Sequence, residues 1–221
     1  MRRLPVLLAL LCCGCGEQAS REAGRPEPAV TGESRSDERP AIVAFGDSLT
    51  AGHGSGAEHP YTEFLQQELD RRGLRYRVVN AGVSGDTSGS GLERVETVAE
   101  RKPAFVIVEF GGNDGLRGLP VATTRANLEE MIVRLQSAGA RVVLAGMTLP
   151  PNYGPDYIRS FERVYTELAA KHHLPLIPFL LEGVGGQAAY MQADGIHPNV
   201  QGNRLVAANV LRVLEPLLGK P

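Results

Sequence analysis

Short apolar runs alternate with longer amphipathic stretches along most of this chain, from residue 41 to the C-terminus. Five runs have the length of strands. Three of these are nearly continuous in apolar and β-branched residues, as is typical of strands buried on both faces of a parallel sheet. The predicted strands are Ala41–Phe45, Tyr76–Asn80, Phe105–Phe110, Arg141–Ala145 and Leu176–Phe179.

The stretches between these runs carry apolar residues at helical spacing. One of them repeats Leu128, Met131, Ile132 and Leu135 on one side and stops before Gly139, a residue type that commonly ends helices. The predicted helices are Tyr61–Arg72, Leu92–Arg101, Thr123–Ala138, Tyr157–Lys171 and Asn199–Leu218. Strand–helix alternation predicts right-handed crossovers, hence one α/β domain with helices on both faces of a parallel five-stranded sheet.

The N-terminus has the pattern of an export signal. Basic Met1-Arg2-Arg3 precedes the apolar run Leu4–Cys13, which is shorter than the roughly 20 residues of a membrane-spanning helix. Cys15 follows Gly14, and the chain then turns polar, so residues 1–15 resemble a bacterial lipoprotein signal with Cys15 as the lipidation site. The alternative is an ordinary secretory signal cleaved nearby. We therefore expect a periplasmic protein held at a membrane surface by its lipid.

The segment 16–40 has no aromatic residue, and its single branched aliphatic residue is Val30. Such a composition cannot bury enough apolar surface to offset chain entropy, so we expect a disordered linker. As a flexible coil it would span roughly 25–30 Å. The folded domain is predicted at residues 41–221.

The composition of the chain limits the classes of binding partner that we expect. The 23 basic residues nearly balance the 25 acidic ones, and no basic stripe is present, so we expect no nucleic-acid binding. The three cysteines, Cys12, Cys13 and Cys15, all belong to the signal. The domain is therefore expected to contain no disulfide, no thiolate nucleophile and no cysteine metal site. For the oligomeric state, our default expectation is a monomer.

Candidate chemistry begins where the first strand ends, at Gly46-Asp47-Ser48-Leu49. Ligands of open α/β sheets bind at the carboxyl ends of the strands. A serine in this place is usually a helix N-cap, but Ser48 is a nucleophile if other loops supply a base, a group that orients the base, and oxyanion donors.

Later loops at the same predicted edge supply these groups. Asp194 precedes His197 by three residues, so its carboxylate can orient the imidazole. Asn113 offers a side-chain amide, and Gly85 and Ser48 offer backbone N–H groups, which are suitable oxyanion donors. Each of these residues taken alone has an ordinary role in a turn or at the surface.

Together, from about Ile42 to Leu218, these segments resemble the SGNH (GDSL) hydrolase family. The resemblance implies a flavodoxin-like three-layer α/β/α sandwich. It also implies a catalytic triad of Ser48, Asp194 and His197, an oxyanion hole formed by Ser48, Gly85 and Asn113, and no metal or organic cofactor. Departures from the pattern are the N-terminal tether and an extra glycine, Gly82, followed by Val83 in the Gly85 block.

Further segments, including Leu149-Pro150-Pro151-Asn152-Tyr153-Gly154, resemble the bacterial periplasmic multifunctional thioesterase/lysophospholipase members of that family. This implies hydrolysis of small-molecule or lipid acyl esters and thioesters, with aryl esters as model substrates. Leu149, Pro150 and Tyr153 are expected to contact the substrate, because their loop offers apolar material for the wall of an acyl pocket.

Three alternatives remain open. A carbohydrate O-acetylesterase could use the same fold, although the chain has no Trp for sugar stacking. A nucleotide-binding module is weakly suggested by Gly52-His53-Gly54-Ser55-Gly56, but the second predicted strand ends in Asn80 and not in an acidic ribose partner. A lipid-tethered binding protein without activity is disfavoured by the complete set of catalytic residue types.

Overall fold

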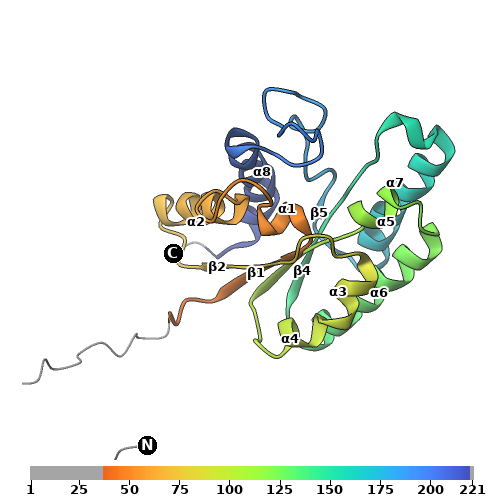
Figure 1. Ribbon diagram of the computed structural model, residues 1–221. Helices are drawn as coiled ribbons and strands as arrows, with labels where there is room; N and C mark the ends of the chain where they lie inside the picture. Colours follow the sequence, from red (N-terminus) through yellow and green to blue (C-terminus); the bar gives the residue numbers. More distant parts are fainter. Residues whose placement is uncertain (1–36, 220–221) are drawn as a thin grey trace, which may run out of the picture. The chain divides into compact units, whose positions relative to one another are not determined.

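The computed structural model describes residues 37–219, which form an α/β unit (Figure 1). Its strands are all parallel and pair in the order β2-β1-β3-β4-β5, the flavodoxin-like order. They are β1 (Ala41–Gly46), β2 (Arg77–Gly82), β3 (Phe105–Glu109), β4 (Arg141–Ala145) and β5 (Leu176–Ile177). The predicted parallel five-stranded sheet is confirmed. The predicted signal, Cys15 and most of the predicted linker lie outside the described residues.

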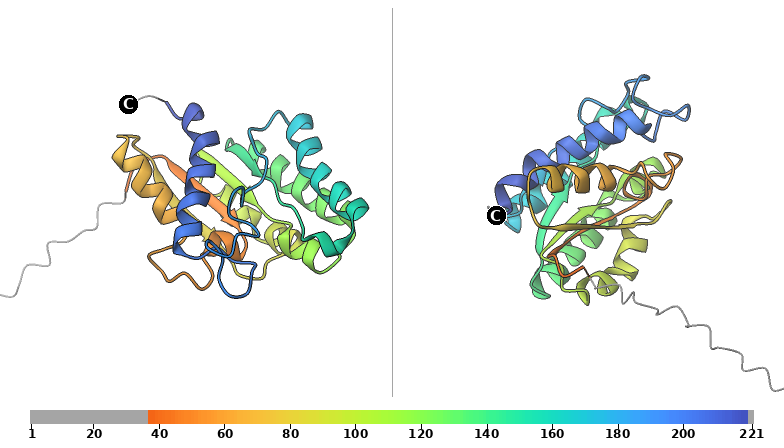
Figure 2. Two further views of the ribbon diagram at one scale, coloured as in Figure 1. Left: turned by 90° about the horizontal axis from the view of Figure 1, so that it is seen from above. Right: turned by 90° about the vertical axis from the view of Figure 1, so that its left-hand side faces the viewer.

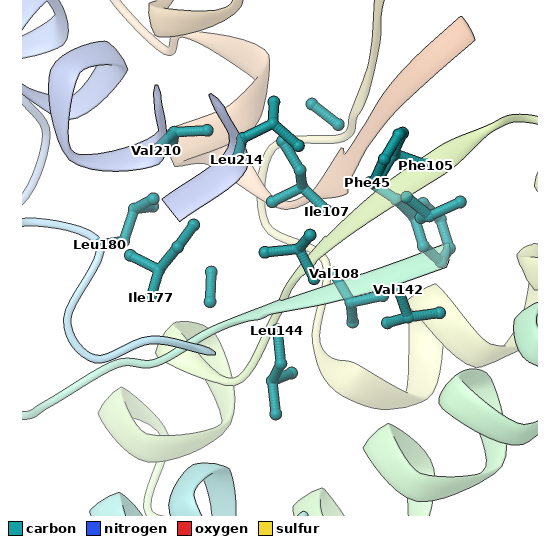
Figure 3. Packing of buried hydrophobic residues seen from close by; sticks show 14 of the residues in the cluster. Phe45, Phe105, Ile107, Val108, Val142, Leu144, Ile177, Leu180, Val210 and Leu214 are labelled. Atoms are coloured by element: carbon teal, nitrogen blue, oxygen red, sulfur yellow. The ribbon is translucent and has the colours of Figure 1, made fainter. Parts of the chain in front are cut away.

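The central strands of the sheet, β1 and β3, are buried. Ile42 of β1 pairs with Val78 of β2 on one side and with Phe105 of β3 on the other. Every residue of β1 and β3 is buried, which explains their nearly continuous apolar sequences. Figure 3 labels the core residues Phe45, Phe105, Ile107, Val108, Val142, Leu144, Ile177, Leu180, Val210 and Leu214.

Helices cover both faces of the sheet (Figures 1 and 2). On one face, α2 (Tyr61–Arg71) packs against α8 (Val200–Leu214). On the other, α6 (Val121–Ser137) packs against β4 and contacts α3 (Ser88–Glu93), α4 (Val95–Ala99) and α7 (Pro155–Lys171). The arrangement is the expected three-layer sandwich, and it directs the carboxyl ends of all five strands toward one edge.

Helix boundaries differ from the prediction where caps decide them. The predicted helix at 92–101 is two short helices, α3 and α4, because the Thr87 side chain accepts the Ser90 N–H and starts a helix at Ser88. The last helix ends at Leu214 and continues as a 3₁₀ turn, Glu215–Leu217. Another 3₁₀ turn, Pro151–Tyr153, precedes α7.

Two very short helices were not predicted, α1 (Ser48–Ala51) and α5 (Gly112–Leu116). Each opens just beyond a strand, and each is too short to show an apolar repeat. They follow β1 and β3, the neighbouring strands at which the strand order reverses, so they lie where this fold class binds ligands.

The folded unit begins slightly before the predicted start at Ala41. The Pro40 carbonyl accepts the Arg77 N–H at 3.1 Å, and Arg39 pairs with Asp70 at 2.9 Å. The segment from Asp37 therefore packs with the domain. Within residues 37–219, no helix has both the length and the apolar character needed to cross a membrane.

Candidate active site

The turn after β1 presents Ser48 at the start of α1. Asp47 is the N-cap of this helix, since its side chain accepts the Leu49 N–H at 3.0 Å. The N-cap role considered for Ser48 is therefore wrong, and its hydroxyl is available for other contacts. Gly46 has no room for a side chain, because a Cβ would collide with Thr50 and Glu109. The glycine thus lets the chain turn tightly onto the serine.

His197 lies within hydrogen-bond distance of this serine although 149 residues separate them. Its Nε2 atom is 2.9 Å from Ser48 Oγ, and its Nδ1 atom is 2.7 Å from Asp194 Oδ2. The three predicted triad residues therefore form one chain of contacts, carboxylate to imidazole to hydroxyl. This geometry is what a hydroxyl nucleophile with an oriented base requires.

Asp194 is held by a tight turn. Its Oδ1 atom accepts the backbone N–H groups of Ile196 and His197 at 2.9 and 3.0 Å, and Gly195 supplies the left-handed conformation with φ +68°. The hydrogen bond from the imidazole, followed by those from the two backbone N–H groups, lowers the pKa of Asp194 to about 2. The carboxylate thus stays ionised at any pH near neutrality.

Asn113 comes from the loop after β3, where Gly111 adopts φ +112°. Its Nδ2 atom donates to the Asp86 carbonyl at 2.9 Å and to Asp47 Oδ2 at 3.1 Å. The first contact joins Asn113 to the loop that contains Gly85, and the second joins it to the nucleophile turn. The structure therefore brings three predicted oxyanion-hole segments into one connected set.

Arg94 connects three of the segments that surround the site. Its guanidinium pairs with Asp86 at 2.8 Å and donates to the carbonyls of Ala81 and Gly46 at 2.8 and 2.9 Å. It also lies over the Phe45 ring, 4.6 Å from the centroid. Because one side chain holds the ends of β1 and β2 and the Gly85 loop, Arg94 is a positioning residue. The sequence contained no signal for it.

An apolar cavity of about 470 Å³ adjoins Ser48 and His197. Leu149 and Pro150 line it, as predicted. Tyr153 is not part of the lining, and its hydroxyl donates to the Leu116 carbonyl at 2.7 Å; its contact with substrate stays a prediction. Further apolar residues line the cavity that were not predicted from the sequence, among them Phe179, Leu181, Met191 and Ile196.

A buried carboxyl pair lies under the nucleophile turn and was not anticipated. Glu109 is fully buried, and its Oε2 atom accepts the Asp47 N–H at 3.2 Å and the Thr50 hydroxyl at 2.8 Å. Its Oε1 atom has no hydrogen-bond partner among the described residues. An acidic residue inside a buried apolar strand was the available signal, because such a group is rarely fully buried without a partner.

Burial makes both carboxyl groups harder to ionise. Burial raises the pKa of Asp47 to about 6, against hydrogen bonds from Leu49 and Asn113 that lower it. Burial first, and then the charge of Asp47, raises the pKa of Glu109 well above its ordinary value. Glu109 therefore ionises less readily than an exposed glutamate.

Replacing Glu109 by glutamine is expected to make stability less sensitive to rising pH. A carboxyl with a raised pKa in the folded state stabilises fully only below its unfolded pKa of 4.5, and that contribution is lost as pH rises toward the folded value. Above pH 4.5, the free energy of unfolding of the variant should therefore rise relative to that of wild type, by up to about 1.4 kcal/mol per pH unit. Urea unfolding from pH 4 to 9 measures this, and parallel curves for the two proteins would contradict it.

Comparison with known proteins agrees with this site. A sequence model described as "GDSL-like Lipase/Acylhydrolase family" matches residues 44–205, most of the chain. The chain belongs to this family. It is therefore a hydrolase of carboxylic esters, and the predicted family is confirmed. The matched region contains Ser48, Gly85, Asn113, Asp194 and His197.

Named relatives cover the same part of the chain. Esterase TesA of Pseudomonas aeruginosa is 48% identical over 178 residues, which are 80% of this chain and 89% of the relative. Thioesterase 1/protease 1/lysophospholipase L1 of Escherichia coli K12 is 37% identical over 80% of this chain and 84% of its own length. A crystal structure of TesA superposes with a TM-score of 0.78, at 47% identity, covering 80% of this chain and 99% of the other.

Within residues 37–219, no group of three or more His, Cys, Asp or Glu side chains is arranged to hold a metal ion.

Proposed function

We propose that this enzyme hydrolyses acyl esters and acyl thioesters, including lysophospholipids, through an acyl-enzyme on Ser48. The observation that carries the proposal is the continuous contact from Asp194 through His197 to Ser48, at 2.7 and 2.9 Å. The printed names of the relatives, an esterase and a thioesterase/lysophospholipase, support the same classes of substrate.

The reaction follows from this contact chain. Ser48 Oγ attacks the acyl carbonyl carbon while His197 Nε2 accepts the hydroxyl proton. Asp194, ionised and bonded to Nδ1, stabilises the imidazolium that forms. His197 then gives the proton to the leaving alcohol or thiol, and the acyl group remains on Ser48. A water molecule, deprotonated by His197, attacks the acyl-enzyme and releases the carboxylic acid.

The oxyanion is stabilised by donors that meet at this edge of the sheet. We assign this role to the backbone N–H groups of Ser48 and Gly85 and to the Asn113 amide. Asn113 Nδ2 currently donates to Asp47 Oδ2 at 3.1 Å, so one of its hydrogens is already directed toward the nucleophile turn. Donors fixed before the reaction cost little reorganisation when the charge develops.

The apolar cavity favours acyl chains longer than acetyl. Its volume, about 470 Å³, lies within the range of pockets for small-molecule ligands. A pocket that accepts only a methyl group needs far less space. The carbohydrate O-acetylesterase alternative is therefore less well supported than an esterase for medium-length or longer acyl chains.

A series of p-nitrophenyl esters from acetyl to octanoyl tests the proposal. Each additional methylene that enters the cavity is worth about 0.8 kcal/mol, so kcat/KM should rise by roughly threefold to fourfold per methylene until the cavity is filled. The measurement is initial rate against concentration for each ester, below its solubility limit. Activity on the acetyl ester alone would instead support the O-acetylesterase.

We also propose that the protein is exported to the periplasm and held there by a lipid on Cys15, with residues 16–40 as a linker. The basic Met1-Arg2-Arg3 segment, the short apolar run and the polar segment after Cys15 support this. We expect the domain to act as a monomer, without nucleic acid, on substrates drawn from or near the membrane surface.

A further inference from the structure

Three exposed polar side chains surround the mouth of the site, each from a different loop. They are His53 after α1, Ser84 between β2 and α3, and Arg117 at the end of α5, and we call them the polar rim. None of them belongs to the cavity lining. The mechanism described above uses none of them.

His53 connects the rim to the catalytic base. Its ring centroid is 4.6 Å from that of His197, at an interplanar angle of 43°. Its Nδ1 atom lies 3.5 Å from Ser84 Oγ, and its carbonyl accepts the Gln192 side-chain N–H at 2.6 Å. His53 is therefore held beside the imidazole that handles the proton.

Arg117 connects the rim to the oxyanion segment. Its Nη2 atom donates to the Gly85 carbonyl at 2.9 Å. No ion pair in the described part of the chain includes Arg117, whereas Arg94 nearby is paired with Asp86. A guanidinium has five N–H donors, so most of those on Arg117 are free for a ligand.

The position of the polar rim indicates which part of a bound substrate would lie near it. The cavity lining includes neither His53 nor Ser84, whereas Leu116, next to Arg117, does line it, so Arg117 stands at the border of the cavity. The leaving atom must approach His197 Nε2, because His197 protonates it. A leaving group at this atom is within reach of His53, whose ring centroid lies 4.6 Å from that of His197, and Ser84 and the Gly85 carbonyl bound by Arg117 follow on the adjoining loop.

We propose that the polar rim binds a phosphate carried by the leaving group, with Arg117 as its principal contact. This deepens the proposed function and rests on it. A guanidinium can donate two parallel hydrogen bonds to phosphate, while the Ser84 hydroxyl and the His53 imidazole can donate one each. The matching substrate class is an acyl ester of a phosphorylated alcohol, such as the glycerol phosphate of a lysophospholipid, or a thioester whose thiol carries phosphate.

The test compares Arg117→Ala with wild type on substrates that share an octanoyl chain. They are 1-octanoylglycerol, 1-octanoylglycerol 3-phosphate and octanoyl-coenzyme A. A charge-assisted pair with phosphate is worth about tenfold in affinity or more. We therefore expect Arg117→Ala to raise KM for the glycerol phosphate ester about tenfold more than for 1-octanoylglycerol. Arg117→Lys should recover part of the loss, since it keeps the charge but not the planar fork.

Arg101→Ala is the matched control. Arg101 is also an exposed arginine, and it precedes β3, at the opposite edge of the sheet from the site. Its substitution should leave the three KM values in their wild-type ratio. A larger effect of Arg117→Ala on the glycerol phosphate ester identifies a lipid headgroup phosphate, and one on octanoyl-coenzyme A identifies a coenzyme phosphate.

Two results would overturn the proposal. Equal losses on all three substrates would mean that Arg117 only orders the Gly85 loop. Unchanged KM values would mean that the rim does not meet the leaving group. Failure of the proposed function is distinguishable from both, because wild type would then hydrolyse none of the three substrates.

Discussion

Replacement of Ser48 by alanine is expected to lower kcat/KM for p-nitrophenyl esters by about 10⁶-fold, the loss typical of a removed serine nucleophile. The hydroxyl is in contact with His197 Nε2 at 2.9 Å, and the domain sequence from 41 onward contains no cysteine that could replace it. Helix α1 should persist because its N-cap is Asp47 and not Ser48. Thermal unfolding should therefore change little while activity is lost.

Ser160→Ala provides the matched control for this variant. Ser160 is also partly buried, and its hydroxyl only donates to the Tyr157 carbonyl within α7. It should keep wild-type activity. A reactive organophosphonate should label wild type and Ser160→Ala at one site and should not label Ser48→Ala. Near-wild-type turnover by Ser48→Ala would refute the acyl-enzyme.

Replacement of Asp194 by asparagine is expected to lower kcat by about 10⁴-fold, as for the corresponding change in other serine triads. Asparagine can still accept the Ile196 and His197 N–H groups through its single oxygen, so the turn should remain. Its amide nitrogen would then face Nδ1 of His197, in place of the Oδ2 atom now 2.7 Å away. The imidazole would favour the tautomer with its proton toward Ser48, which cannot act as a base.

The comparison for this variant is Asp156→Asn, an exposed carboxylate that pairs with Arg159 on α7. It should leave kcat unchanged. The double variant Ser48→Ala/Asp194→Asn should be no slower than Ser48→Ala alone, because a base without its nucleophile has nothing to activate. Additive losses, or a loss below tenfold in Asp194→Asn, would show that Asp194 does not orient the base.

Much of the fold could be predicted from single segments. Arg141–Ala145 was predicted with the bounds observed for β4, and β1 and β3 differ from prediction by one residue at the carboxyl end. These strands are buried on both faces, so the apolar composition of each segment is enough to predict a buried strand. Helix α3 and the short helices α1 and α5 could not be predicted in this way, because capping and tertiary contacts form them without an apolar repeat.

In the candidate site too, local contacts could be predicted from the sequence and long-range contacts could not. Asp194 and His197 share one tight turn, so their contact could be predicted from a spacing of three residues. The contact between His197 and Ser48 joins residues 149 positions apart and depends on how the strands are ordered. Tyr153 lies in a segment of apolar wall residues, but it is not part of the cavity lining, and its hydroxyl donates to the carbonyl of Leu116.

The class of fold, the family and the residue types of the site could all be predicted from the sequence, because local apolar patterns and short motifs indicate each of them. Which side chains are in contact depends on how the chain packs. The tertiary structure placed Glu109 beneath Asp47, where burial raises the pKa of Glu109, and it shaped the apolar cavity from loops that follow four different strands. It also set Arg117 against Gly85, with no acidic partner among residues 37–219. These features could not be predicted from the sequence, because burial, long-range contacts and the neighbours of a charged group arise only when distant segments pack together.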